Sequence, residues 1–474
     1  MRAGNHSRSV TLILTVILFV FLCSVCLAID RPFNLPPTER RVLPSGLVII
    51  LMEKRDLPLV DLQILIPIGS AEDPRNEEGL ANLTASLLRK GTRTRSAQEI
   101  ADQVDLRGAE LSVATREDRI ILSMEVMSAD AGFASALLAD LIENPTFTQE
   151  EFDKEKQNVL ASLESDKDDV ARYASMGFRR FLLGDHPYAH PVKGYSESLS
   201  RIQRSDVELF HKKSFSPKNA ILAVVGDFDA EQMLSLLRRD FSHWKIGRVE
   251  GNVTVQPPVA VQGRRVCIVD KPDATQTQLR IGNVAFARKS ADYFPGLVSN
   301  AILGGVFSSR LMTEVRVNRG LTYTIFSRFA PLKDGGVFTI TTFTKTETTG
   351  DALSVIIEQM DRLVSGGVRE EELAKVKSYL NGQFPLSLET PEAIANLLLE
   401  VEFYGLPQDY AARFRHNVDS ITKENVADIA RRYFGTANIA VLALGKASEI
   451  SPQLEAMAKP EIVDIDWKPL GSSQ

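Results

Sequence analysis

Hydrophobic positions along this chain recur with two different periods. Short runs that are continuously apolar, or that alternate with polar residues, have the character of fully or half-buried strands. In the first half they cover residues 47–52, 60–67, 109–115 and 120–126, and in the second half residues 266–270, 278–282, 322–330 and 336–343. These runs predict two groups of β-strands, one in each half of the chain.

Longer stretches carry apolar residues at the spacing of an α-helix. One covers residues 96–107, where Ser96 and Glu99 form a capping box and Gly108 ends the helix, and another covers residues 148–166. Three more cover residues 348–364, 369–381 and 392–404. Strands grouped apart from runs of helices predict an α+β protein, in which mainly antiparallel sheets are covered by helices.

Two distant segments of the chain are similar to each other. Residues 215–226 and 434–445 share Phe, Asn and Gly at a constant offset of 219 residues, and in each a helical stretch leads into an apolar strand. The helix before the first copy is predicted to begin at Ser205, which forms a capping-box pattern with Glu208. A repeat of this length predicts two homologous domains of about 200 residues rather than a solenoid. We place them at residues 36–246 and 264–460, with a linker at 247–263 and a tail at 461–474.

The composition is that of an ordinary globular protein. Of the 474 residues, 44% are hydrophobic and 24% are charged, which argues against both a disordered chain and an integral membrane bundle. The formal net charge is −6 and the chain has no stripe of Lys and Arg, so we expect no nucleic-acid partner.

The first 28 residues have the pattern of an export signal. Arg2 and Arg8 precede an apolar run from Val10 to Leu27, and Ala28 offers a small residue at a cleavage point. We therefore expect a periplasmic or secreted protein; an uncleaved membrane anchor is the alternative, because the apolar run is long. Cleavage leaves Cys267 as the only cysteine, which excludes intrachain disulfides, and its apolar neighbours predict a buried strand residue.

Residues 79–92 read Gly-Leu-Ala-Asn-Leu-Thr-Ala-Ser-Leu-Leu-Arg-Lys-Gly-Thr. This segment resembles the zinc-binding helix of the pitrilysin/insulinase-like metallopeptidases, G-x-A-H-x-x-E-H-x-x-x-x-G-T. Asn82, Ala85 and Ser86 stand where the family has His, Glu and His. In that helix the two imidazoles share one face and bind zinc, while the Glu is the general base. Ala85 cannot accept a proton and Asn82 and Ser86 are poor zinc ligands, so this helix cannot activate water.

The resemblance also locates the family's third zinc ligand, a Glu about 76 residues after the second His. The corresponding position here is Ser162, in an ordinary helical sequence, and Glu155 matches a further acidic residue of the family. We therefore expect this chain to bind no metal. His186 and His190 are four residues apart, but Pro187 and Pro191 argue against a helix that would bring them together, so we expect a loop role for both.

Further matches extend the resemblance over almost the whole mature chain. They are residues 186–188, 218–219, 270–280, 302–311 and 316–323. The family implies two homologous domains per chain, with two chains or halves closing like a clam shell around a peptide.

Arg316 and Tyr323 have the spacing of the family's Arg/Tyr pair, which reaches toward the zinc site from a C-terminal domain. A Tyr hydroxyl and a guanidinium can stabilise the oxyanion that forms during peptide hydrolysis and can orient the substrate. The alternative is that Arg316 is a surface helix charge and Tyr323 a strand aromatic, with Gly320 ending the helix.

These features lead to two hypotheses. The family includes two-subunit enzymes of the mitochondrial-processing-peptidase type, in which one chain carries H-x-x-E-H and zinc and a homologous chain carries the Arg/Tyr pair. The first hypothesis is that this chain is such a non-catalytic subunit of a zinc metalloendopeptidase, inactive alone and binding peptide or unfolded protein. The alternative is a non-enzymatic scaffold or peptide-binding protein of the same fold. No Ser/His/Asp or Cys/His constellation supports an independent hydrolase.

Overall fold

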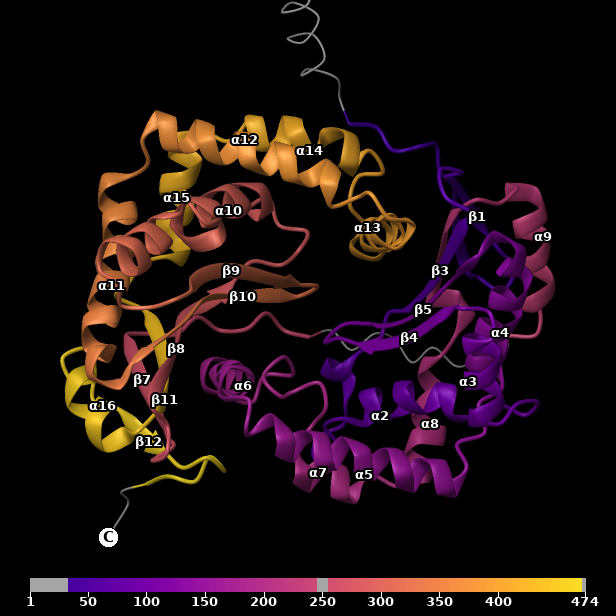
Figure 1. The fold of residues 1–474 in the computed structure, drawn as a ribbon, viewed down its shortest axis with the longest axis horizontal. Coiled ribbons are helices and arrows are strands. Elements are labelled where there is room, and N and C mark those ends of the chain that lie inside the picture. The colour runs from indigo at the N-terminus through magenta and orange to yellow at the C-terminus, as the bar shows by residue number, and fades with distance from the viewer. Residues whose placement is uncertain (1–32, 245–254, 471–474) are drawn as a thin grey trace, which may run out of the picture.

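The computed structural model describes residues 33–244 and 255–470. The expected signal segment, residues 1–28, and residues 247–254 of the expected linker lie outside this part of the chain. Figure 1 shows two α+β domains side by side around a common interior. Within the described residues, no helix is both long and apolar enough to cross a bilayer.

The N-terminal domain is built on a six-stranded sheet with the order β1-β2-β6-β3-β5-β4. Its strands are β1 (Glu39–Val42), β2 (Val48–Glu53), β3 (Leu59–Ile66), β4 (Glu110–Thr115), β5 (Ile120–Met127) and β6 (Ile221–Gly226). Its helices are α2 (Leu80–Leu87), α3 (Ala97–Asp105), α4 (Ala131–Glu143), α5 (Gln149–Asp166), α6 (Val170–Leu183), α7 (Ser196–Arg201), α8 (Arg204–Ser214) and α9 (Ala230–Asp240). Only β2 and β6 pair in parallel; the other neighbours are antiparallel.

The C-terminal domain has a sheet of the same size, with the order β12-β7-β11-β8-β10-β9. Its strands are β7 (Arg264–Asp270), β8 (Gln276–Ala285), β9 (Ile325–Leu332), β10 (Gly335–Lys345), β11 (Ile439–Gly445) and β12 (Glu461–Val463). Its α-helices are α10 (Tyr293–Asn300), α11 (Thr349–Gly366), α12 (Glu370–Leu386), α13 (Pro391–Tyr404), α14 (Tyr410–Asp419), α15 (Lys423–Tyr433) and α16 (Ala447–Leu454). Two π-helical turns, η5 (Ala301–Gly305) and η6 (Met312–Asn318), lie between α10 and β9.

These sheets confirm the predicted fold of two homologous, mainly antiparallel α+β domains. The two copies of the sequence repeat form β6 and β11, which occupy the same place in their sheets. The capping box at Ser96 is present. The predicted helix start at Ser205 is wrong: α8 begins at Arg204, because the Asp206 carboxylate accepts a hydrogen bond from the Gln203 amide at 2.8 Å and makes Gln203 the cap. The expected tail contributes β12, which pairs with β7.

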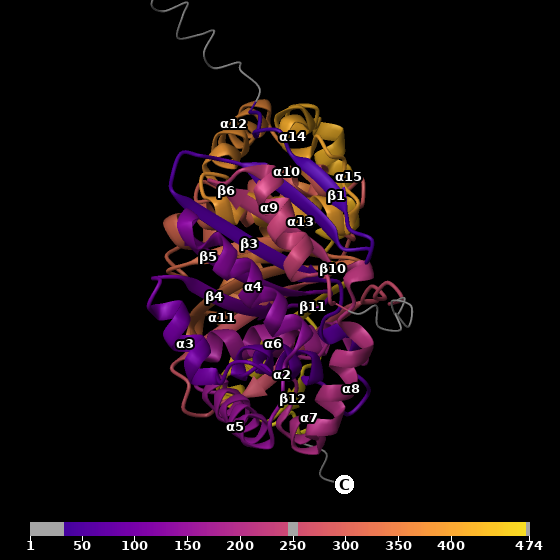
Figure 2. The ribbon, with the colours of Figure 1, turned by 90° about the vertical axis from the view of Figure 1, so that its right-hand side faces the viewer.

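Each domain covers one face of its sheet with its own helices. Figure 2 shows α4 and α9 on the outer face of the N-terminal sheet, and the residues between these layers form one continuous apolar core. A second core of the same kind lies in the C-terminal domain. Cys267 is buried in β7, as expected from its neighbours, and burial raises the pKa of its thiol to about 12.

The other face of each sheet is covered by a helix of the opposite domain. Helix α6 of the N-terminal domain packs on β8 and β11, where Ala174 and Phe178 contact Leu442 and its apolar neighbours. Helix α13 of the C-terminal domain packs on β3 and β6, where Ile394 and Leu399 are buried. Figure 1 shows both helices beside the sheet of the other domain. This exchange buries apolar surface between the domains and fixes their relative position.

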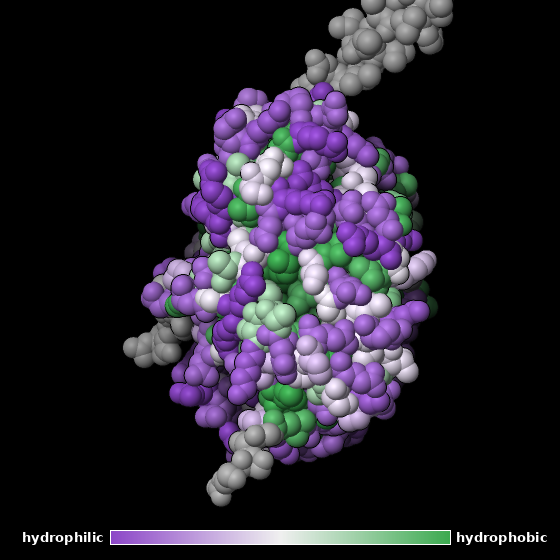
Figure 3. Space-filling model, turned by 90° about the vertical axis from the view of Figure 1, so that its left-hand side faces the viewer, coloured by the Kyte–Doolittle hydropathy of each residue, from purple (hydrophilic) through white to green (hydrophobic). Residues whose placement is uncertain are grey.

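The outward face of the C-terminal domain is mostly hydrophilic, with small separate hydrophobic areas (Figure 3). Scattered apolar residues of this kind are normal on a protein surface.

Candidate functional site

Helix α2 carries three of the four residues at the lost zinc-site positions. Its first turn is held by Asp73, whose carboxylate oxygens accept hydrogen bonds from the backbone amides of Gly79 and Ala81, both at 2.7 Å. Gly79 has a positive φ of 103°, which glycine adopts without strain. The start of the helix is therefore firmly fixed.

The side chains at the three motif positions have no metal-binding or basic chemistry. Ala85 is buried in the domain core, and Asn82 and Ser86 are half-buried. Helix α2 packs on β4, α5 and α8, so the helix is integrated in the domain even though its functional groups are absent.

Ser162, at the position of the third ligand, is held by a lysine. It lies on α5, and its hydroxyl oxygen accepts a hydrogen bond from the Lys193 ammonium at 2.5 Å. The same ammonium pairs with the Asp166 carboxylate at 2.9 Å. The Lys193 carbonyl lies against the start of α2, where a Cβ on Gly79 would come within 2.5 Å of its oxygen. An ammonium group therefore lies beside the third-ligand position, where it opposes a divalent cation.

Glu155, which matches the family's additional acidic residue, also contacts a lysine. The mostly buried carboxylate of Glu155 pairs with Lys90, which follows α2, at 3.1 Å. Glu155 is therefore a salt-bridged helix residue, which is the role that we expect of it in the absence of a metal. With lysines at both positions on α5, the residues present do not fit a zinc ion.

The two histidines of the loop after α6 do not converge on a common point. The His186 Nε2 atom is 2.7 Å from the Gln256 carbonyl oxygen, and the His190 Nδ1 atom is 3.0 Å from the Pro191 carbonyl oxygen. Each ring therefore bonds to backbone, which confirms the expected loop role. In residues 33–244 and 255–470, no group of three or more His, Cys, Asp or Glu side chains is placed to hold a metal ion.

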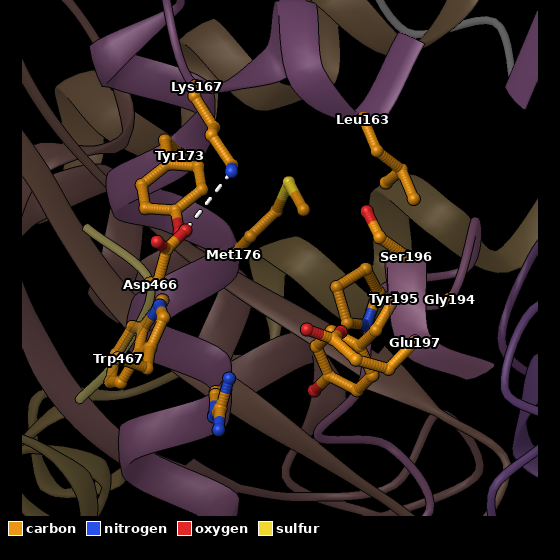
Figure 4. Close-up of a pocket in the computed structure, with 13 residues that line it drawn as sticks. Leu163, Lys167, Tyr173, Met176, Gly194, Tyr195, Ser196, Glu197, Asp466 and Trp467 are labelled. Atoms are coloured by element: carbon orange, nitrogen blue, oxygen red, sulfur yellow. Dashed lines mark hydrogen bonds and ion pairs between the residues drawn. The ribbon is translucent and has the colours of Figure 1, made fainter. Parts of the chain in front are cut away.

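A small cavity of about 110 Å³ is lined in part by Leu163, which follows Ser162 on α5 (Figure 4). It lies between α5, α6, the start of α7 and the C-terminal segment, and its walls include Leu163, Met176, Tyr195 and Trp467. Lys167 and Asp466 pair across its edge at 3.1 Å. The cavity offers aromatic rings and two carboxylates but no imidazole or thiolate, so its donors do not suit zinc.

Arg316 and Tyr323, the expected Arg/Tyr pair, lie together in the C-terminal domain. Arg316 belongs to η6, and Tyr323 precedes β9. The Arg316 guanidinium carbon is 4.9 Å from the centre of the Tyr323 ring and 5.1 Å from that of Phe307. Between the pair, Gly320 has a φ of +62°, which allows the sharp turn after η6.

The Tyr323 ring faces solvent, and Arg316 is half-buried. Tyr323 is 74% exposed and Phe307 is 69% exposed. Within the described part of the chain, the Tyr323 hydroxyl has no hydrogen-bond partner, and the only polar contact of the Arg316 guanidinium is a long one of 3.9 Å to the Met312 sulfur. The alternative role of Tyr323 as a strand aromatic is wrong, because β9 begins at Ile325 rather than at residue 322. The hydroxyl and the guanidinium are therefore adjacent and available to an external group.

Two residues of these sites, Lys193 and Phe307, are not predicted from the sequence. Lys193 follows Pro191 in a loop, and nothing in its local pattern indicates that it reaches Ser162. Phe307 was part of a matched segment but was given no role. A signal is nevertheless present: Phe307 lies in the short segment Gly304-Gly305-Val306-Phe307-Ser308-Ser309, where few neighbouring side chains are large enough to bury an aromatic ring.

Comparison with known proteins identifies the family. A model described as "Insulinase (Peptidase family M16)" matches residues 48–175, and one described as "Peptidase M16 inactive domain" matches residues 201–380. Together the two models cover more than half of the chain.

Some relatives are named as proteases and one is named as a non-peptidase. An uncharacterized zinc protease of Mycobacterium tuberculosis (strain ATCC 25618 / H37Rv) is 28% identical over 428 residues, which is 88% of this chain and 96% of that protein. A non-peptidase homolog of Helicobacter pylori (strain ATCC 700392 / 26695) is 24% identical over 403 residues, 84% of this chain and 91% of that protein.

A solved structure agrees over most of the chain. The peptidase M16 inactive domain from Pseudomonas fluorescens superposes with a TM-score of 0.81 at 26% identity, covering 86% of this chain and 98% of that one. The fold, the order of the motifs and both family models agree, and this chain therefore belongs to the insulinase-like peptidase family M16.

Proposed function

We propose that the chain is the non-catalytic subunit of a heteromeric zinc metalloendopeptidase and that it supplies Arg316 and Tyr323 to the zinc site of a homologous partner. The partner would carry the intact H-x-x-E-H helix, and its zinc would polarise the scissile carbonyl and activate water. This chain binds no metal in the proposal, because Lys193 lies beside the position of the third ligand.

The observation that carries the proposal is the contrast between the two motifs. At the zinc-site positions every functional group is absent and the neighbouring acidic positions are engaged by lysines. At the Arg/Tyr motif, both polar groups are present, adjacent and without a competing polar partner in the described residues apart from the weak sulfur contact. A chain with no role in catalysis has no need to keep an exposed hydroxyl beside a guanidinium.

The geometry also gives each residue a task. The Tyr323 hydroxyl donates a hydrogen bond to the carbonyl oxygen of the peptide as negative charge develops there. The Arg316 guanidinium, held over two aromatic rings, presents its remaining N–H groups to the same oxygen or to the peptide backbone. Phe307, whose ring centre is 5.1 Å from the guanidinium carbon, also orients Arg316 and is a positioning residue.

A non-enzymatic scaffold or peptide-binding protein is the second candidate. The contacts of Arg316 with Phe307 and Tyr323 favour it, because exposed aromatic and arginine side chains also build binding surfaces. In either role, the export pattern of residues 1–28 supports a periplasmic or secreted location.

The two candidates are separated by mixing this chain with the homologous H-x-x-E-H chain encoded nearest to it. Turnover of an unstructured peptide is measured for each chain alone and for the mixture. The proposal requires activity that depends on both chains and on Tyr323; full activity in the partner alone supports the scaffold.

A further inference from the structure

A cavity of about 830 Å³ opens between the two domains, and its lining contains neither Arg316 nor Tyr323. Its floor is the edge of the C-terminal sheet, formed by β9 and β10, and its walls come from α6, α10, α13 and the turn between β4 and β5. The size is in the range of sites that bind a small molecule or a few residues of a peptide.

The charge of this cavity is opposite to that of the whole chain. The lining contains five arginines and two glutamates: Arg116, Arg119, Arg179, Arg288, Arg328, Glu117 and Glu400. Five positive and two negative charges leave a local net charge of +3, whereas the chain has a formal net charge of −6. Positive charge concentrated in a concave site attracts anionic ligands.

Three of the arginines form ion pairs with the two glutamates. Arg179 pairs with Glu117. Arg119 and Arg288 share Glu400, at 3.4 Å and 3.7 Å. These contacts account for both carboxylates of the lining.

Arg116 and Arg328 remain available. Both side chains are exposed, and within residues 33–244 and 255–470 neither has a side-chain hydrogen bond or an ion pair. Arg116 comes from the N-terminal domain and Arg328 from β9 of the C-terminal domain. Each domain therefore contributes one free guanidinium group to the lining of the cavity.

The floor of the cavity combines charge with an aromatic ring. Phe326 and Arg328 are two residues apart on β9 and point to the same face, opposite Thr341 and Thr339 of β10. Phe326 is 45% exposed. An apolar side chain and a carboxylate that follow each other along an extended ligand can contact the ring and the guanidinium together.

Hydrogen bonds within and between the domains hold the rim of the cavity in place. Asp118, next to the cavity, accepts a hydrogen bond from the Tyr188 hydroxyl at 2.6 Å and another from the Lys333 amide at 2.8 Å. On the other side, Arg119 donates to the Tyr404 hydroxyl at 2.7 Å. A site held in this way loses little conformational entropy when a ligand binds.

From these observations we infer that the cavity binds a carboxylate-bearing peptide segment, with the carboxylate paired to Arg328 and Arg116 and an apolar side chain against Phe326. The inference rests on the proposed peptide-binding function and names its preferred ligand. The carboxylate comes from an acidic side chain or from the peptide C-terminus, and both sources present the same planar anion to a guanidinium.

The test is fluorescence anisotropy with a labelled, unstructured peptide that carries glutamates and a phenylalanine. A matched peptide has glutamine at each glutamate, and each peptide is used with a free and with an amidated C-terminus to separate the two sources. The variants are Arg116→Gln, Arg328→Gln and both together. Arg238→Gln, an exposed residue on α9 outside the cavity, removes the same charge as a control.

We expect the double variant to weaken binding of the acidic peptide by about tenfold or more, because charged hydrogen bonds are lost. The control variant binds as the wild type does, and the glutamine peptide with an amidated terminus binds weakly to all. Equal binding of the acidic and neutral peptides, or no loss in the double variant, overturns the inference. So does displacement by single-stranded DNA at the affinity of the peptide, because that outcome means binding of any polyanion.

The outcome is separable from that of the proposed function. In one outcome, Tyr323→Phe lowers turnover in the mixed assay while the double variant still binds the peptide as the wild type does. That result supports the composite active site and contradicts peptide binding in this cavity. Weakened peptide binding in the double variant without any dependence of turnover on Tyr323 retains the cavity and favours the scaffold.

Discussion

The ammonium nitrogen of Lys193 lies 2.5 Å from the hydroxyl oxygen of Ser162, the residue at the position of the family's third zinc ligand. The loss of the metal site is therefore more than the loss of ligands. A permanent positive charge now lies at its edge and is held there by Asp166 as well. Substituting the ligand positions alone leaves that charge in place, so both the zinc content of the wild-type chain and the zinc affinity of a restored site should depend on Lys193.

The wild-type chain should contain no stoichiometric zinc after purification. Asn82, Ser86 and Ser162 offer no imidazole or carboxylate, and Lys193 opposes a divalent cation. Elemental analysis after dialysis against a weak chelator is the measurement. One tightly held zinc per chain contradicts the prediction and requires a site that neither motif contains.

Restoring the ligands should restore zinc binding fully only when Lys193 is also neutralised. The variant with Asn82→His, Ala85→Glu, Ser86→His and Ser162→Glu is expected to bind zinc weakly, because the carboxylate at position 162 pairs with Lys193. Adding Lys193→Met should raise the zinc affinity by about tenfold or more, since the competing cation is removed.

Competition with a chromophoric chelator gives the zinc affinity, and circular dichroism shows whether the fold is intact. The control adds Lys375→Met, an exposed lysine on α12, to the same four substitutions. Equal affinity with and without Lys193→Met means that this lysine does not set the affinity. A folded variant that takes up no zinc at all means that α2 and α5 do not present the ligand positions to a common point.

Stability should depend on pH through Asp61 of β3. Asp61 lies opposite Glu125, which lies opposite Glu110, so three carboxylates form a row across neighbouring strands. Burial, with Glu125, Glu392 and Glu110 nearby, raises the pKa of Asp61 to about 7. Because the folded state binds the proton more tightly than the unfolded state, wild-type stability falls as the pH rises from about 4 to about 7.

Asp61→Asn should remove this dependence. Relative to the wild type, the variant gains up to about 4 kcal/mol above pH 7, and the gain disappears below about pH 4, where Asp61 is protonated in both states. Urea denaturation at several pH values measures the difference. Asp105→Asn, an exposed residue at the end of α3, is the control. If the gain in the free energy of unfolding does not change with pH, the effect of the substitution comes from packing and not from ionisation of Asp61.

Much of the fold can be predicted from the sequence because the pattern of apolar residues follows directly from burial. The predicted strand at 60–67 is β3 (Leu59–Ile66), and the predicted helix at 392–404 is α13 (Pro391–Tyr404). The exchange of α6 and α13 between the domains could not be predicted. Phe178 and its neighbours give α6 an apolar face, but a face of this kind does not indicate which sheet it will cover.

The residues of the candidate sites also fall into a group that the sequence predicts and a group that it does not. Positions that belong to a motif, such as Ser162 and Tyr323, are found by their spacing. Contacts between distant segments cannot be found in this way. Lys193 contacts Ser162, which is 31 residues away in the sequence, and Arg116 lines the same cavity as Arg328. Side chains that meet only in the folded chain leave no periodic signal, so neither the position of the Lys193 ammonium nor the charged cavity could be predicted from the pattern along the chain.

The last prediction tests the composite active site. Tyr323→Phe removes one hydroxyl from an exposed ring and should leave the fold and the partner affinity unchanged. If the hydroxyl donates to the oxyanion on the partner's zinc, turnover of the mixed subunits falls by about 100- to 1000-fold, the usual cost of losing one oxyanion donor. Arg316→Ala should lower turnover as well and raise KM, because the guanidinium also positions the peptide.

The matched control is Tyr379→Phe, which removes the same hydroxyl from a half-exposed tyrosine on α12. It should leave turnover at the wild-type value, since α12 carries no part of the Arg/Tyr motif. Single-turnover kinetics of the mixture separate chemistry from binding, and partner affinity is measured on the same samples. A composite site requires the loss to appear in the chemical step with Tyr323→Phe and not with Tyr379→Phe; an equal, unchanged rate in both means that this chain contributes structure rather than chemistry.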